Sequence, residues 1–279
     1  MDPFEQTQKI LEGVQIPPQP AVLMEAHGEM QKDEPDLSRI AAILSKDVAL
    51  SASVLKTVNS PFFGLPNEVS SIPYAVSLLG LGPTLNIVAG LALKQAFNDS
   101  ACPEVQGFWD SAANVSKLAA FVSQRLGNAA PDEAYLLGLF HDSGIPLMAC
   151  KFTGYMAMMT ELADGGTFAN KEDERFHTNH SVVGFLTGRQ WGLAQHIRDA
   201  ILDHHHVERV LNPYATSGSL SESLIANLKL AEHADDLFYG HEDGEWGRIK
   251  GYVLDYLSLS EHDCDDLLDD MQELLLDCD

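Results

Sequence analysis

Apolar side chains recur along this 279-residue chain with the period of an α-helix. Several rows lie at the spacing i, i+3, i+4 and i+7, or at a repeated spacing of four, which places them on one helix face. These rows are Leu37-Ile40-Ala41-Leu44, Leu50-Val54-Val58 and Leu85-Val88-Ala89-Ala92. No stretch of useful length alternates between apolar and polar residues in the manner of a strand. The pattern therefore predicts an all-α protein.

Prolines and glycines mark where the predicted helices begin and end. Residues 59–66 contain two prolines and a glycine, which end one helix. Gly127 fits the position after a helix that runs from about residue 104 to residue 126. The prolines that suit first-turn positions of further helices are Pro73, Pro83 and Pro131. We expect helices separated by short turns rather than by a flexible linker.

Five of the predicted helices each carry one polar side chain within an apolar row. These side chains are Ser111 (with Phe108, Val115 and Leu118), His141 (with Ala134 and Leu137), His180 (with Phe176 and Val183), His204 (with Ile197, Ala200 and Ile201) and Glu232 (with Ile225 and Leu228). Buried polar groups must find partners, and one shared cluster satisfies all five. Asp142 and His205 directly follow two of the histidines and extend the set.

Two interpretations of this cluster remain open from spacing alone. Imidazole and carboxylate groups are the usual ligands of iron, manganese, zinc and nickel, so the cluster is a candidate metal site. Alternatively, each histidine is a hydrogen-bonded core residue without a metal. His177 lies one turn before His180 and could replace it, and His206 extends the His204-His205 run. The histidines expected to be solvated or structural are His27, His196, His233, His241 and His262.

The charge of the chain limits its partners. Lys and Arg number 17 against 41 Asp and Glu, which gives a formal net charge of −24. That charge repels nucleic acid and anionic membranes, so we expect no partner of either kind. No stretch is long and apolar enough to span a bilayer, and residues 1–13 are too polar for a signal peptide. The scattered cysteines, Cys102, Cys150, Cys264 and Cys278, favour reduced thiols and a cytoplasmic location.

The C-terminal segment is strongly acidic and amphipathic. From Asp255 onward it contains ten acidic residues and no Lys or Arg, and these carboxylates should disfavour an anionic ligand nearby. An apolar stripe is formed by Leu267, Leu268, Met271 and Leu275. The favoured interpretation is a final helix packed on the body with its acidic face in solvent. The alternative is a detachable helix that offers the stripe to a partner.

Several sequence segments together are typical of one family. In the N-terminal half they are Ile16-Pro17-Pro18-Gln19-Pro20-Ala21-Val22, Ile43-Leu44-Ser45-Lys46-Asp47-Val48-Ala49-Leu50, Val58-Asn59-Ser60-Pro61-Phe62-Phe63-Gly64 and Ile72-Pro73-Tyr74-Ala75-Val76-Ser77-Leu78-Leu79-Gly80. In the second half they are Leu137-Gly138-Leu139-Phe140-His141-Asp142-Ser143-Gly144, His180-Ser181-Val182-Val183-Gly184, Trp191-Gly192-Leu193 and Ala200-Ile201-Leu202-Asp203-His204-His205. The chain resembles the HDOD domain, a bacterial signalling relative of the HD phosphohydrolases and the HD-GYP phosphodiesterases, over roughly residues 14 to 210.

The resemblance implies a division of the chain. An HDOD domain over residues 14–212 would consist of an N-terminal helical half, residues 14–100, packed on an HD-like helical bundle. The bundle would cover residues 101–235 and so extend past the core match. Acidic C-terminal helices would occupy residues 236–279.

The chain departs from the HD enzymes at several positions. The first metal-binding histidine of the family falls on Ser111, and the last aspartate is replaced by Glu232. The lysine that often follows the His-Asp-x-Gly turn is replaced by Ile145-Pro146, and no Gly-Tyr-Pro triplet follows His205. The ligand set that the resemblance implies is His141, Asp142, His180, His204, His205 and Glu232, which could bind one divalent transition metal or two.

These departures favour a signal-transduction module without catalytic activity. Such a module would bind signalling proteins and use the degenerate HD pocket as a scaffold. The competing hypothesis is a metal-dependent phosphohydrolase acting on a nucleotide or another phosphoester, by attack of metal-activated water. A third is nucleotide sensing without hydrolysis.

Overall fold

The computed structural model describes residues 3–98, 108–160, 168–212, 218–241 and 244–276. All regular secondary structure in these ranges is helical, which confirms the predicted all-α class. The helices are α1 (Pro3–Ile10), α2 (Ala21–Met30), α3 (Leu37–Leu44), α4 (Val48–Val58), the 3₁₀ helix η1 (Pro61–Phe63), α5 (Ile72–Leu79), α6 (Leu81–Asn98), α7 (Phe108–Leu126), α8 (Pro131–Phe140), α9 (Gly144–Lys151), α10 (Tyr155–Thr160), α11 (Phe168–Phe176), α12 (His180–Gln190), α13 (Gln195–Asp203), α14 (Val207–Val210), α15 (Leu220–Tyr239), α16 (Trp246–Leu257) and α17 (Glu261–Leu276). The expected beginning of the seventh helix, near residue 104, lies outside the described residues.

Local sequence sets most helix ends where the pattern predicts them. Pro73 and Pro131 lie in the first turns of α5 and α8, where a missing N–H costs nothing. Gly127 follows α7 with a positive φ of 65° and donates its N–H to the Ser123 carbonyl at 2.8 Å. One prediction was wrong: Leu37 is 52% exposed, because as the first residue of α3 it faces solvent while the rest of its row is buried.

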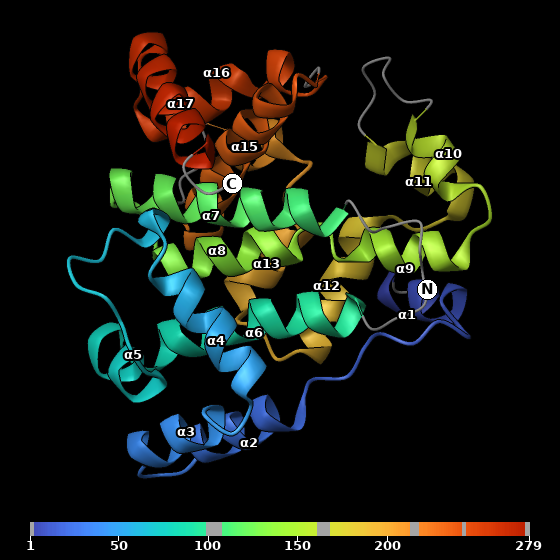
Figure 1. Cartoon of the computed structure of the whole chain (residues 1–279). Helices are drawn as coiled ribbons and strands as arrows, with labels where there is room; N and C mark the ends of the chain where they lie inside the picture. The colour runs from blue at the N-terminus through green and yellow to red at the C-terminus, as the bar shows by residue number, and fades with distance from the viewer. Residues whose placement is uncertain (1–2, 99–107, 161–167, 213–217, 242–243, 277–279) are drawn as a thin grey trace.

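Helix α8 lies in the middle of the molecule and is surrounded by α6, α7, α13 and α15 (Figure 1). After its acidic first turn the helix is apolar on every side, and the residues from Ala134 to Phe140 are all buried, as expected for a helix enclosed by others. Helices α2 to α5 lie at one end of the molecule and α15 to α17 at the other (Figure 1). One continuous core joins both ends. The C-terminus of α8 lies inside this core, and the side chain of His141, which follows it, is buried. The boundaries proposed for the two halves and the tail stay predictions.

Helices α7 and α8 approach each other most closely at Gly138. A Cβ added at this glycine would lie 2.4 Å from the Cα of Ser116. Only a residue without a side chain fits that crossing. The close contact fixes α8, and with it the residues that follow α8, against α7.

The C-terminal helix α17 packs on the body, in agreement with the favoured interpretation of the acidic tail. Its apolar stripe, Leu267, Leu268, Met271 and Leu275, is buried. Gln272 donates a hydrogen bond to the Ala234 carbonyl of α15 at 2.7 Å, and Arg125 of α7 pairs with Asp270 at 3.3 Å. Most of the acidic side chains of α17 face solvent.

The N-terminal segment crosses over the later helices before α2 begins. The indole N–H of Trp191, a fully buried residue after α12, donates to the Pro17 carbonyl at 3.0 Å. The same indole packs edge-on against Phe140, the last residue of α8. None of the helices in the described ranges is both long enough and apolar enough to cross a bilayer.

Replacing Gly138 with Ala should destabilise the protein by about 1–3 kcal/mol, because the new methyl group overlaps the backbone of α7. Urea denaturation followed by circular dichroism measures this change. Gly251→Ala is the matched control, since Gly251 lies in α16 with nothing within 4 Å of an added Cβ. That variant should gain about 0.5–1 kcal/mol from helix propensity. Equal stability of the two variants would contradict the close approach at Gly138.

Candidate metal centre

Two of the histidines directly follow the last residue of a helix. His141 comes after α8 and His204 after α13. In each, the ring Nδ1–H donates to the carbonyl three residues earlier, Gly138 at 2.9 Å and Ile201 at 2.7 Å. These carbonyls belong to the final helix turn, where they have no intrahelical partner. The hydrogen bonds fix both rings and direct each Nε2 toward the interior.

His180 is held by a different device at the start of α12. The side chain of Asn179 accepts the Val182 N–H at 2.9 Å and so caps the helix at His180. The prediction that Phe176 and His180 share one helix face was wrong, because α11 ends at Phe176 and α12 begins at His180. The ring is nevertheless buried, since the turn between the two helices returns it to the core.

A buried carboxylate orients the His180 ring. Glu172 of α11 has no exposed surface and accepts the His180 Nδ1–H at 2.5 Å and the His180 backbone N–H at 3.1 Å. The hydroxyl of Tyr155 donates to the other oxygen of Glu172. Burial alone would lower the pKa of His180, but the Glu172 charge outweighs it and raises that pKa. A carboxylate that accepts from the far nitrogen of an imidazole is a common support for metal-binding histidines.

A close backbone contact brings His180 to the His141-Asp142 pair. A Cβ added at Gly144 would lie 2.1 Å from the His180 carbonyl oxygen. The first residue of α9 therefore has to be glycine for α12 to begin so near. This contact explains in steric terms why glycine follows His141-Asp142-Ser143 in the chain.

The Nε2 atoms of two histidines lie beside one oxygen of Asp142, and a third histidine lies next to them. Oδ1 of Asp142 lies 3.3 Å from Nε2 of His180 and 3.3 Å from Nε2 of His204. Nε2 of His180 lies 3.4 Å from that of His204 and 2.9 Å from that of His205. All four ligand atoms lie within 4.8 Å of one another. The chain thus gathers one carboxylate oxygen and three imidazole nitrogens at one point.

These four groups fit a divalent transition metal. Ligands about 2.0–2.1 Å from a tetrahedral zinc-type ion lie about 3.3–3.4 Å from each other, close to most of the separations observed here. Oδ1 of Asp142 is buried and accepts no hydrogen bond within the described residues. A bound cation would satisfy that oxygen and separate imidazole lone pairs that otherwise face one another.

The second oxygen of Asp142 belongs to a neighbouring group. Nε2 of His141 lies 3.4 Å from Asp142 Oδ2 and 3.2 Å from Glu232 Oε1. The other oxygen of Glu232 pairs with the ammonium group of Lys229 at 2.9 Å, and that ammonium also contacts Glu245 at 3.0 Å. Lys229 is only 3% exposed. The cluster therefore contains a buried lysine that the predicted ligand set did not include.

The ionisation of these groups follows from their surroundings. Burial opposes the charge on His141, but Asp142 and Glu232 outweigh it and raise the pKa of His141 to about 10. Burial would likewise raise the pKa of Glu232, yet the neighbouring cations lower it to about 2. Burial lowers the pKa of His204, and that of His205 lies well below its ordinary value. His204 and His205 are thus neutral imidazoles near pH 7, the form that binds metals.

A cavity of about 270 Å³ adjoins the cluster and opens between α7, α9, α15 and α16. The ionisable side chains and the serine along its wall are Ser111, His141, Asp142, His205, Lys229, Glu232, Asp235, Asp236 and Glu245. The expectation that Ser111 points into the core was wrong: the residue is exposed at the cavity wall, and its hydroxyl donates to Asp235 at 2.6 Å. Five carboxylates outnumber the two cations of this wall, Lys229 and protonated His141, so the cavity is negative.

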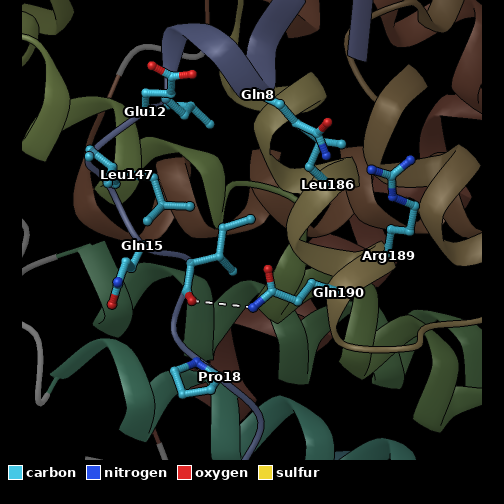
Figure 2. A pocket seen from close by; sticks show the side chains of 12 residues that line it. Gln8, Glu12, Gln15, Pro18, Leu147, Leu186, Arg189 and Gln190 are labelled. Carbon is cyan, nitrogen blue, oxygen red and sulfur yellow. Dashed lines mark hydrogen bonds between the residues drawn. The ribbon is translucent and has the colours of Figure 1, made fainter. Parts of the chain in front are cut away.

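A larger depression of about 630 Å³ lies elsewhere, between residues 8–18 and helices α9 and α12. Figure 2 shows Arg189, Leu186 and Gln190 of α12 facing Gln8, Glu12 and Pro18 across it, with the Gln190 amide bonded to the Ile16 carbonyl. None of the clustered histidines or carboxylates lines this depression. The chemistry therefore belongs to the smaller cavity.

Comparison with known families agrees with this geometry. The family model described as HDOD domain matches residues 16–207, more than half of the chain. The chain belongs to the HDOD family. It is similar in fold to an HDOD domain protein of unknown function from Geobacter sulfurreducens, with a TM-score of 0.70 and 22% identity over 98% of this chain and 95% of that one.

Two further proteins are similar to this HDOD protein. A Shewanella amazonensis protein named "Putative metal-dependent phosphohydrolase" has the same fold, with a TM-score of 0.66 and 19% identity over 98% of this chain and 99% of that one. An uncharacterized protein of Treponema pallidum is 24% identical over 202 residues, 71% of this chain. The chain spans 39% of the length of that relative.

The structure brings all six predicted ligands of the HDOD site together, whereas His177 and His206 are exposed outside the cluster. Sequence reasoning missed the groups around them, which are Tyr155, Glu172, Lys229 and Glu245. The contact of Lys229 with Glu232 could have been predicted, since Lys229 precedes Glu232 by three residues on one helix face. The contact of Glu172 with His180 could not, because a turn separates the two residues and the contact depends on how that turn folds.

Glu172→Gln should weaken divalent metal binding by about 10–100-fold, because the amide cannot match the carboxylate as an acceptor for His180. Competition of the protein with a chelating dye for Zn²⁺ measures the affinity. Glu174→Gln, an exposed change on the same helix, is the control and should leave the affinity unchanged. An unaltered affinity in Glu172→Gln would show that Glu172 does not support a metal ligand.

Proposed function

We propose that this protein is an HDOD-type signal-transduction module that acts through protein–protein interaction and does not catalyse hydrolysis. The observation that carries the proposal is the presence of Ser111 at a metal-ligand position of the HD enzymes. Where the HD enzymes place a metal-binding histidine, the chain has a hydroxyl that is already bonded to Asp235 at 2.6 Å. A neutral hydroxyl is a poor replacement for imidazole on a borderline metal.

The charge around the cavity also disfavours phosphoester substrates. Its wall contains five carboxylates, and its single lysine, Lys229, is held in ion pairs with Glu232 and Glu245. No lysine follows Gly144, where the family often has one, because Ile145 and Pro146 stand there. An anionic substrate would therefore meet repulsion with little compensation from this chain's own side chains.

The metal ion in this proposal has a structural role. Asp142, His180, His204 and His205 would hold iron, manganese, zinc or nickel, and when bound the ion would supply a Lewis acid and a site for water. Its binding would link the turn between α8 and α9, the start of α12 and the residues after α13, and thereby stabilise the fold. The scaffold would then present its surface to signalling proteins, with neither nucleic acid nor membrane as a partner.

The cytoplasm is the compartment that we propose. Cys264 is a free thiol, which is typical of a reducing environment. The formal charge of −24 supports the absence of nucleic acid among the partners.

A metal-dependent phosphohydrolase is the competing function. The fit of the four ligand groups and the open cavity of about 270 Å³ beside them favour it. Under this alternative, the cavity would admit a nucleotide or another phosphoester next to the metal, and the carboxylates at its wall would orient attacking water.

The purified protein should contain divalent metal and show no turnover of generic phosphomonoesters and phosphodiesters with added manganese, iron or magnesium. Metal content is measured by atomic emission, and turnover by phosphate release or a chromogenic diester. Asp142→Ala should lose most of the metal, because the Asp142 oxygen lies next to the rings of both His180 and His204 and is the carboxylate of the proposed site.

Two results would decide against the proposal. Turnover that disappears in both His141→Ala and Asp142→Ala would establish the hydrolase. If the protein contains no metal before or after incubation with each candidate ion, the metal site is absent, and both proposed functions lose it. A thermal shift caused by nucleotide without turnover would instead indicate nucleotide sensing.

A further inference from the structure

The cluster consists of two halves that share Asp142. Oδ1 faces His180 and His204, whereas Oδ2 faces His141. The second half is completed by Glu232, 3.2 Å from the His141 ring, so it too offers an imidazole and carboxylates. The residue types alone therefore permit a cation in each half.

Asp235 adds a further acceptor on the side of Glu232. This residue is only 4% exposed and lines the same cavity as Glu232 and His141. Its Oδ2 accepts from Ser111, but its Oδ1 is buried and has no hydrogen-bond donor among the described residues. This oxygen is a further acceptor that a cation in the second half could contact.

A fixed cation already stands in the second half. The Lys229 ammonium lies 2.9 Å from Glu232 and 3.0 Å from Glu245, and the side chain is 3% exposed. Burial opposes the charge of Lys229, but the two carboxylates outweigh it and raise the lysine pKa. Glu232 thus gives one oxygen to Lys229 and the other to His141.

We infer that the Lys229 ammonium takes the place of a second metal ion, so that this protein binds one divalent cation rather than two. A divalent ion between His141, Asp142 and Glu232 would be repelled by an ammonium held on the same carboxylate. The first half has no such lysine in contact with its ligand atoms among the described residues. The inference rests on the proposed metal binding and adds the number of ions and the residue that sets it.

Removing the ammonium should open the second position. Lys229→Met replaces the ammonium with an uncharged side chain of similar length. Glu232 and Glu245 would then lose the cation that they share and would favour a divalent ion. We expect Mn²⁺ binding to rise from one equivalent per chain to two. Equilibrium dialysis with atomic emission counts the ions, and electron paramagnetic resonance detects the magnetic coupling of two neighbouring Mn²⁺ ions.

Three control variants isolate the effect of the charge. Lys229→Arg keeps the charge and should bind one ion. Lys250→Met removes a lysine from the surface of α16, where it pairs with Glu261 at 3.5 Å, and should also bind one. Glu232→Gln combined with Lys229→Met removes a ligand of the second position and should return the count to one.

Folding is followed separately by circular dichroism and thermal denaturation. If Lys229→Met does not fold, the number of bound ions is measured instead in Lys229→Gln and in the single variant Glu232→Gln. Lys229→Gln should bind two ions, and Glu232→Gln in the otherwise unchanged protein should still bind one, because the occupied position lies on the histidine side.

The possible outcomes separate this inference from the proposed function. Two ions in the unaltered protein, or one ion in a folded Lys229→Met or Lys229→Gln variant, would overturn the role of Lys229 and leave metal binding intact. Loss of all metal in folded Glu232→Gln would also overturn it, because the ion would then lie on the Glu232 side. No metal in the unaltered protein would overturn the proposed metal site itself.

Discussion

The carboxylate of Asp142 is the group on which the organisation of this site depends. One oxygen lies 3.3 Å from the rings of both His180 and His204, and the other faces His141. The adjacent cations outweigh the effect of burial and keep the pKa of Asp142 well below its ordinary value. A permanent negative charge at this depth requires positive partners, and the histidines, Lys229 or a metal ion are the groups that can supply them. The histidine cluster and its metal capacity are therefore consequences of one buried anion.

The fold provides this arrangement through close backbone contacts rather than through the histidines themselves. Gly138 allows α8 to lie against α7, and Gly144 allows α9 to begin beside His180. The helices then stop where their ends can hold the rings, since the terminal carbonyls of α8 and α13 accept the Nδ1–H groups of His141 and His204. A helix end thus fixes both the position and the Nδ1–H of these two rings.

Much of the fold and several buried positions of the cluster were predictable because helical spacing is a local property. The rows containing His141 and His204 identified buried positions correctly, and the family resemblance was confirmed over residues 16–207. The row assigned to His180 was wrong, since a break between α11 and α12 interrupts it, although the ring is buried. Ser111 was placed in the core, yet it lies at the cavity wall. The contacts of Glu172 and Glu245 depend on loops and on packing between helices, which apolar periodicity does not encode.

The most direct test of the account is anomalous diffraction from crystals of the unaltered protein soaked in Mn²⁺. Two wavelengths on either side of the manganese absorption edge would locate each ion without reference to activity. We expect one manganese peak per chain, enclosed by Asp142, His180, His204 and His205, with the Lys229 ammonium still bonded to Glu232. A peak between His141 and Glu232, or no peak among the histidines, would contradict it.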